Sequence, residues 1–139
     1  MEFEDTVSFL LAKIAVAHRN LTEKAAKGAG LHSGQAFVLF ELWKQDGQRQ
    51  VDLAAKLSLT PPTVNRILGG LLENDFVTRA HYENDARSTR IFLTDKGVRV
   101  RTKLAEQWAV LEERTLGGLT ETEALMLRQL LAKLVVDLI

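Results

Sequence analysis

Three side chains near the start of one short segment have the chemistry to bind the edges of nucleic-acid bases. Arg66 points away from an apolar stripe when residues 61–73 are placed on a helical wheel, and Thr63 and Asn65 lie at its flanks. Arginine suits the O6 and N7 atoms of guanine, asparagine suits adenine or a phosphate, and threonine reaches a thymine methyl group or a phosphate. The alternative is that these polar side chains only face solvent.

A helix-turn-helix pattern would position these side chains. Residues 51–57 predict a short helix, residues 58–60 a turn, and Thr60-Pro61 is typical of the start of a second helix over about 61–73. The first half of such a helix is the part that enters the major groove. The pattern alone is a weak signal, because many helical hairpins share it. We expect these inward-facing residues: Val51, Ala54, Leu57, Val64, Ile67, Leu68, Leu71 and Leu72.

Two glycines interrupt the second helix. Gly69 and Gly70 each cost about 0.8–1 kcal/mol relative to alanine in a helix interior. One interpretation is a close approach of the backbone to DNA or to the preceding helix. The other is a loss of phosphate contacts and a frayed helix end. If the position faces DNA, Gly70→Arg should tighten binding and steepen its salt dependence.

A β-hairpin is predicted directly after this helix. Residues 76–82 and 89–94 are rich in β-branched and aromatic side chains, which favours strands, and the polar residues 83–88 lie between them. At this tip Arg87 would enter a minor groove, whose narrow width concentrates negative potential. A helix-turn-helix followed by a hairpin is the order of a winged helix-turn-helix domain, so we expect a mainly α fold with a small β-hairpin.

The charge of the chain is concentrated in its middle. The 139 residues carry 18 basic and 18 acidic side chains, but residues 49–103 hold ten basic against six acidic, a net charge of +4. Residues 1–48 hold five against six, net −1, and residues 104–139 hold three against six, net −3. Such a basic block is a footprint of nucleic-acid binders, although a solvated charged face would look the same.

The last helix is too apolar for the surface of a monomer. Removing its leucine stripe from water would gain about 25 cal/mol per Å², which indicates a subunit interface. The alternative is packing against the protein's own first helix. The interface residues that we expect are Val7, Leu10, Leu11, Leu127, Leu131, Leu134 and Leu138. Four other helices are predicted. The first covers residues 5–27 and ends at Gly28 and Gly30, and the second begins at a Ser33 cap and ends at Asp46-Gly47. A third runs from a Thr94 cap to about Leu116, and the last begins with the capping box Thr120–Glu123.

The hairpin and the residues after it resemble the MarR family of bacterial transcription regulators. The family's wing carries an arginine, then D-x-R, then five residues, then L-T-x-x-G, and this sequence matches at Arg79, Asp85, Arg87, Leu93, Thr94 and Gly97. The helix order and the length agree as well. The sequence departs from the family at Gly69 and Gly70, where polar or charged residues are usual, and at Asp75, where glycine is usual.

The resemblance implies a homodimer that binds a pseudo-palindromic operator in double-stranded DNA, usually as a repressor. Residues 1–32 and 104–139 would mainly form the dimer, and residues 33–103 the DNA-binding region, with a recognition helix at about 61–73 and a wing at about 77–94. Arg79 would contact phosphate, and Asp85 would pair with Arg87 or Arg90 to shape the tip. The complete set of candidate DNA-binding residues is Thr60, Pro62, Thr63, Asn65, Arg66, Arg79, Asp85, Arg87 and Arg90.

Family pockets lie between the dimerisation helices and the winged region, which implies a site for an aromatic or apolar effector. The candidate residues are His18, His32, Phe37, Trp43 and Trp108, although each is more often a core residue than a ligand contact. We expect no metal, cofactor or catalytic activity, because the three histidines stand without cysteine and no nucleophile, base and orienting acid assemble. We expect a cytoplasmic protein without a membrane span. The alternative function is a winged-helix module that binds protein instead of DNA.

Overall fold

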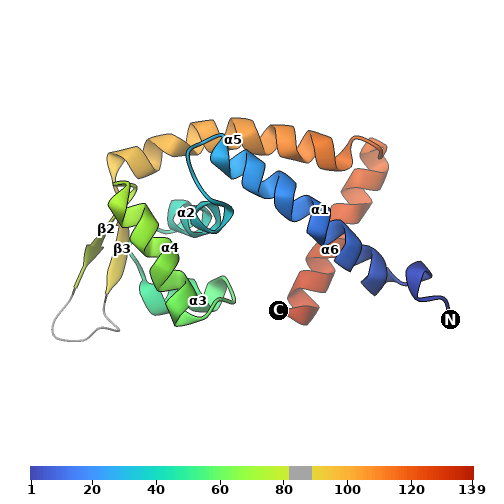
Figure 1. The fold of residues 1–139 in the computed structure, drawn as a ribbon, viewed down its shortest axis with the longest axis horizontal. Coiled ribbons are helices and arrows are strands. Elements are labelled where there is room, and N and C mark those ends of the chain that lie inside the picture. The colour runs from blue at the N-terminus through green and yellow to red at the C-terminus, as the bar shows by residue number, and fades with distance from the viewer. Residues whose placement is uncertain (82–88) are drawn as a thin grey trace.

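The computed structural model describes residues 1–81 and 89–139, and within them it contains six α-helices and a three-stranded antiparallel sheet (Figure 1). The helices are α1 (Val7–Lys27), α2 (Ser33–Lys44), α3 (Gln50–Lys56), α4 (Pro61–Glu73), α5 (Asp95–Leu116) and α6 (Glu121–Leu138). A short 3-10 helix, η1 (Phe3–Asp5), precedes α1, and the strands are β1 (Gln48–Arg49), β2 (Val77–Ala80) and β3 (Arg90–Leu93). The predicted class, mainly α with a winged helix-turn-helix, is confirmed.

The sheet has one more strand than the sequence predicted. Its order is β1-β3-β2, with Gln48 opposite Ile91 and Val77 opposite Leu93. β1 has two residues, too few to show a period-2 pattern, so sequence reasoning could not find it. The strands β2 and β3 are also shorter than the predicted segments, and the expected tip, residues 83–88, lies outside the described residues.

The core of the winged region surrounds α2, as its apolar sequence predicted. Ala36, Val38, Leu39 and Leu42 of α2 are fully buried. They pack in one cluster with the fully buried Leu53, Val64, Leu68, Leu71 and Ile91. One inward residue was assigned wrongly: Val51 is 45% exposed, because α3 turns Leu53 and Ala54 toward the core.

Four threonine or serine caps were predicted, and three are confirmed. Thr60, Thr94 and Thr120 accept hydrogen bonds from the backbone N–H of Thr63, Gly97 and Glu123. The fourth was wrong by one residue: His32 is the N-cap of α2, and Gln35 Oε1 accepts the His32 N–H at 2.9 Å. Ser33 is the first helical residue, and its N–H is bound by a carboxylate of α1.

The long helix α5 lies along α1, and α6 descends from the far end of α5, away from the winged region (Figure 1). α1 ends at Lys27, and Gly30 takes a left-handed φ of 79° that lets the chain turn into α2. Within the described residues, no helix is long and apolar enough to cross a membrane.

Candidate nucleic-acid interface

The outward face of α4 is polar and open, as the helical wheel predicted. Pro62, Arg66, Gly69 and Glu73 are exposed, whereas Val64, Leu68 and Leu71 on the opposite face are fully buried. Arg66 forms no hydrogen bond or ion pair with any described residue. An uncompensated guanidinium on an exposed helix face retains all its donors for an external acceptor.

Three candidate residues lie together at the start of α4. The Thr60 hydroxyl accepts the Thr63 N–H at 3.4 Å, and the two hydroxyl oxygens are 2.9 Å apart. Asn65 lies on the exposed side two residues after Thr63, where its Oδ1 accepts a hydrogen bond from Gln50 Nε2 of α3 at 3.3 Å. The contact orients Asn65 along the surface that α3 and α4 share.

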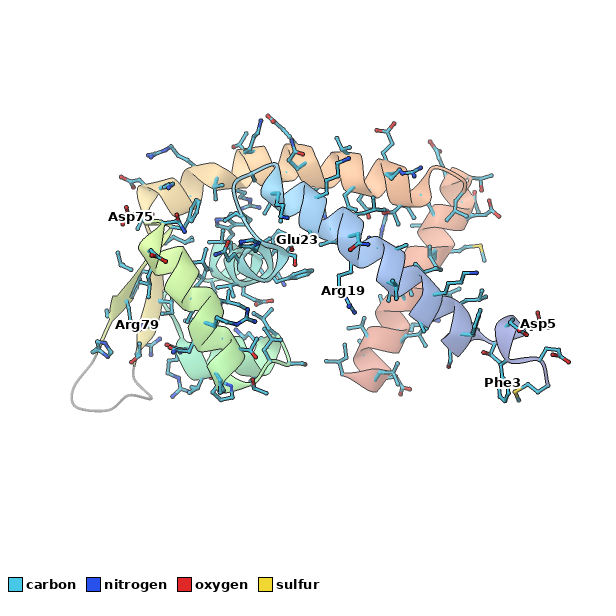
Figure 2. All side chains as sticks on the ribbon, in the orientation of Figure 1. Phe3, Asp5, Arg19, Glu23, Asp75 and Arg79 are labelled. Carbon is cyan, nitrogen blue, oxygen red and sulfur yellow. The ribbon has the colours of Figure 1, made fainter. Side chains whose placement is uncertain are left out.

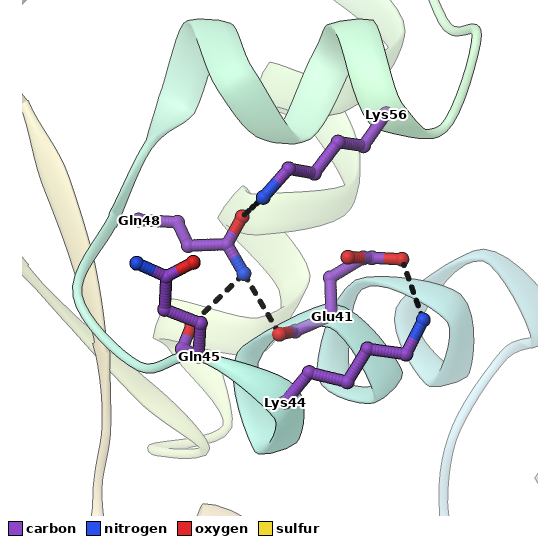
Figure 3. A network of polar contacts seen from close by, with 5 residues as sticks. All are labelled: Glu41, Lys44, Gln45, Gln48 and Lys56. Atoms are coloured by element: carbon purple, nitrogen blue, oxygen red, sulfur yellow. Dashed lines mark hydrogen bonds and ion pairs between the residues drawn. The ribbon is translucent and has the colours of Figure 1, made fainter.

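A polar network fixes α3, the first helix of the helix-turn-helix, against α2 (Figure 3). The Gln48 side chain is only 5% exposed, and its Nε2 donates to the carbonyl oxygens of Glu41 at 2.7 Å and Gln45 at 2.8 Å. Lys56 Nζ of α3 donates to Gln48 Oε1 at 2.6 Å. Gln48 thus gives a second donor to the Glu41 carbonyl, which already accepts the Gln45 N–H at 3.0 Å, and a donor to the Gln45 carbonyl just after the end of α2. Nothing in the sequence pattern singled out Gln48.

The candidate arginines of the hairpin are in different environments. Arg79 on β2 is half-buried, and its Nε is buried without a hydrogen-bond partner among the described residues. Arg90 on β3 donates from Nη1 to the Gly47 carbonyl at 2.9 Å, which ties the hairpin to the loop before β1. The predicted phosphate contact of Arg79 therefore depends on its terminal nitrogens. Asp85 and Arg87, the predicted tip residues, lie outside the described residues.

An open pocket of about 320 Å³ separates the helix-turn-helix from the sheet. Val51, Ala54 and Val64 form part of its apolar lining, and Asn65 and Arg79 are among its polar residues. The exposure of Val51 has its explanation here, since the side chain lines this pocket and not the core. Candidate residues of α4 and of the hairpin thus border the same hollow surface.

The L-T-x-x-G segment joins the base of the wing to α5. The Thr94 hydroxyl donates to the Asp75 carbonyl at 2.6 Å and accepts the Gly97 N–H at 3.0 Å. A Cβ atom at Gly97 would lie 2.1 Å from the Phe76 carbonyl oxygen, so only glycine fits. Asp75, which departs from the family's usual glycine, nevertheless adopts a left-handed φ of 61°.

The two glycines in α4 have different surroundings. A Cβ at Gly70 would lie 2.5 Å from Gln35 Nε2 of α2, whereas a Cβ at Gly69 would meet nothing within 4 Å. Gly70 therefore allows a close approach to α2. One interpretation expected such an approach to a helix, but the helix is α2 and not α3, which directly precedes α4. Arginine at position 70 would displace Gln35, so the open position for an added cation is Gly69.

Phe37, Trp43 and Trp108 of the predicted effector site come together in one aromatic cluster with Phe40. The ring centroids of Phe40 and Trp108 are 5.0 Å apart, and those of Phe37 and Trp108 are 6.0 Å apart. Trp43 Nε1 donates to the Gly97 carbonyl at 2.9 Å. The two histidines lie elsewhere: His18 Nδ1 is 3.3 Å from the Thr22 hydroxyl of its own helix, and His32 pairs with Glu23.

A slot of about 430 Å³ opens beside this cluster, and two basic side chains that the sequence did not lead us to expect there line it. Phe40, Trp43 and Trp108 line it together with Lys44 and Arg101, and the Arg101 guanidinium carbon lies 5.7 Å from the centre of the Trp43 ring. The sequence spacing could have indicated both basic residues, because Lys44 is four residues from Phe40 and Arg101 is seven from Trp108, which places each pair on one face of its helix. Among the described residues, no three His, Asp or Glu side chains are grouped to hold a metal ion.

The candidate interface residues form exposed apolar surfaces. Every large apolar side chain of α6 is between 37% and 85% exposed, and α6 contains no buried residue. Val7, Leu10 and Leu11 at the start of α1 are exposed as well. α6 has no extensive contact with another element of the described chain, so its stripe is not covered by the protein's own first helix.

Comparison with known proteins places these features in one family. The model of the MarR family matches residues 31–89. The HTH-type transcriptional repressor MdtR of Bacillus subtilis (strain 168) is 30% identical over 106 residues, which are 76% of this chain and 68% of MdtR. The structure of the S. aureus MepR–DNA complex is 25% identical, with a TM-score of 0.77 over 99% of this chain and 100% of MepR. BpsR of Bordetella bronchiseptica, whose DNA binding is regulated by 6-hydroxynicotinic acid, shares the fold, at 22% identity and a TM-score of 0.84 over 97% of this chain and 96% of BpsR. The chain, with its winged helix-turn-helix and its L-T-x-x-G segment, belongs to the MarR family of transcriptional regulators.

Proposed function

We propose that the protein is a sequence-specific transcriptional regulator that binds a pseudo-palindromic DNA operator as a homodimer. The exposed face of α4 carries the proposal, because Arg66 stands there without an acidic partner among the described residues, flanked by Thr63 and Asn65. This face would enter the major groove, and the wing would enter the adjacent minor groove. The relation to MepR, which is known in complex with DNA, supports the same mode of binding.

Dimerisation is supported by the exposed apolar surfaces of α1 and α6. Stripes this large are unusual on a monomer and mark interaction sites. We infer that residues 1–32 and 104–139 mainly form the dimer, and that residues 33–103 contact DNA. A second copy related by a two-fold axis would cover both stripes at once and would set two α4 helices side by side.

Regulation by a small molecule is the third part of the proposal. The slot beside Trp43 and Trp108 offers aromatic faces, and Lys44 and Arg101 at its edge would attract an anionic group. It lies between α2 and α5, so an occupant would contact both the long helix that leads to α6 and the helix that supports α4. Repression, with release of DNA when an aromatic effector binds, follows the example of MdtR as a repressor and BpsR as a ligand-regulated protein.

Selection of bound sequences from random duplexes by the purified protein tests this function. The proposal predicts enrichment of a two-fold symmetric site whose half-sites are separated by about one helical turn, roughly 10 base pairs. Failure to enrich any sequence would contradict the proposal and would favour the alternative, a winged-helix module that binds protein. Thermal shifts with small aromatic acids, compared between the parent and Trp108→Ala, test the slot separately.

A further inference from the structure

One carboxylate of α1 reaches across the turn into α2. Glu23 Oε2 accepts the Ser33 N–H at 3.0 Å, and Glu23 Oε1 lies 2.8 Å from His32 Nδ1. Figure 2 shows Glu23 on the part of α1 that passes close to α2. The Ser33 backbone N–H and the His32 ring lower the pKa of Glu23 to about 2, so the carboxylate stays charged at neutral pH.

The first turn of α2 in turn supports the recognition helix. Gln35 Oε1 accepts the His32 N–H at 2.9 Å, and Gln35 Nε2 occupies the space beside Gly70 of α4. On the same side, a Cβ atom at Gly34 would lie 3.0 Å from Ile67 Cδ1. The middle of α4 therefore rests on the turn of α2 that Glu23 holds, and a rotation of that turn would move α4.

Glu23 differs from the rest of α1 in the kind of contact it makes. Within residues 1–81 and 89–139, its hydrogen bonds are the only ones from a side chain of α1 to another element. The other contacts of α1 with the winged region and α5 are packing contacts, such as those of the buried Ala25 and Ala26. Apolar packing is non-directional and resists separation more than sliding, whereas a two-pronged carboxylate contact fixes an orientation.

We propose that Glu23 is a positioning residue that sets the angle between the dimerisation helix α1 and the helix-turn-helix. It thereby sets the separation of the two recognition helices in the dimer. The inference rests on the proposed function, because it concerns how two copies span one operator. Two half-sites are bound together only when their spacing matches that separation, and one base pair changes it by about 3.4 Å and roughly 34°.

The test uses the selected operator and derivatives with one base pair inserted into, or removed from, the spacer. Affinities are measured for the parent, Glu23→Ala and Glu23→Gln, with Glu106→Ala as a control that removes an exposed carboxylate of α5. A duplex with a single half-site measures the recognition surface alone. Circular dichroism melts establish that each variant is folded.

The parent and Glu106→Ala should lose about tenfold or more in affinity on either altered spacer. Glu23→Ala should bind the matched operator about fivefold more weakly, lose less than about threefold on the altered spacers, and bind the half-site like the parent. Glu23→Gln, which keeps an acceptor for the Ser33 N–H but loses the charge, should lie between them.

Two results would overturn the inference alone: a spacer dependence of both Glu23 variants equal to that of the parent, or an equal loss on all duplexes, including the half-site. A parent protein that bound no duplex at all would overturn the proposed function and this inference with it.

Discussion

Alanine substitutions at Gly97, Gly70 and Gly69 are predicted to lower, leave nearly unchanged and raise the stability of the protein, in that order, because a methyl group meets different surroundings at each. All three lie within helices, so each substitution gains about 0.8–1 kcal/mol of helix propensity. The difference arises from the space around the new Cβ atom, which the structure gives directly.

At Gly97 the new Cβ would lie 2.1 Å from the Phe76 carbonyl oxygen. That oxygen already accepts the Thr94 N–H at 3.1 Å, and it shares the single hydrogen of the Thr94 hydroxyl, 3.1 Å away, with the Asp75 carbonyl, so the backbone must move by about an ångström against these contacts. Forced overpacking costs about 1–3 kcal/mol or more, and lost hydrogen bonds add about 1 kcal/mol each. After the gain in propensity, Gly97→Ala should destabilise the protein by about 2–3 kcal/mol.

The new Cβ of Gly69→Ala would meet no atom within 4 Å. The substitution should therefore stabilise the protein by about 0.8–1 kcal/mol, the whole gain in helix propensity. At Gly70 the added Cβ would press on Gln35 Nε2 at 2.5 Å. That group ends a flexible side chain, but its displacement weakens the hydrogen bond between Gln35 and the His32 N–H. The gain and the loss are each about 1 kcal/mol, so Gly70→Ala should be close to neutral.

The assay is thermal unfolding at one fixed protein concentration, because a dimer's melting temperature depends on concentration. For a chain of this size, about 1 kcal/mol corresponds to roughly 3–5 °C in melting temperature. Gly69→Ala should therefore melt above the parent, and Gly70→Ala should melt at about the same temperature as the parent. Gly97→Ala should melt about 6–15 °C below the parent. A Gly97→Ala protein as stable as the parent, or a Gly69→Ala protein less stable, would refute the reasoning.

Three other changes have defined outcomes. Because the pKa of Glu23 is lowered from 4.5 to about 2, its contribution of roughly 1–2 kcal/mol, after solvent screening, is full above about pH 5 and is lost as the pH falls toward 2. Urea unfolding of the parent and Glu23→Gln should therefore differ at about pH 6 and converge near pH 2, and a constant difference would contradict this. Gly69→Arg should tighten operator binding and steepen the slope of log affinity against log salt by about 0.9 per added contact, which a salt titration measures; an unchanged slope would remove this face from the interface. Leu131→Asp in α6 should yield monomers in light scattering, because burying the two copies of Leu131 in a dimer contributes about 4 kcal/mol. The control Gln129→Asp should remain dimeric, and a dimeric Leu131→Asp would exclude the leucine stripe of α6 from the dimer interface.

Regular patterns in the sequence predicted most of the fold. The apolar spacing in α4, the three threonine caps and the L-T-x-x-G segment from Leu93 to Gly97 are local patterns, and the structure agrees with each of them. The errors have local causes as well. β1 is too short for a pattern, and at α2 a histidine and a glutamine took the capping role assigned to Ser33.

The site was harder to predict, because its features arise between elements. Gln48 owes its role to partners three to eight residues away, and Glu23 to partners nine and ten residues away. Gln35 lies beside a glycine of another helix. Gly70 was ambiguous for the same reason, since the sequence does not show which side chain of α2 lies beside it. His32 was expected near the aromatic residues, and it lies instead at the start of α2, because helix α2 separates its first turn from Phe40 and Trp43 near its end.

The central claim is that paired α4 helices present cations to DNA, and the salt dependence of operator binding by the parent and by Arg66→Glu tests it most directly. We predict that the parent's log affinity falls with log salt by about 0.9 for each phosphate contacted, a slope of roughly −5 or steeper for a dimer. Arg66→Glu should bind the operator at least about 100-fold more weakly, because both copies exchange an attraction for a repulsion. Equal affinities for the two proteins, or binding by the parent that did not depend on salt, would contradict it.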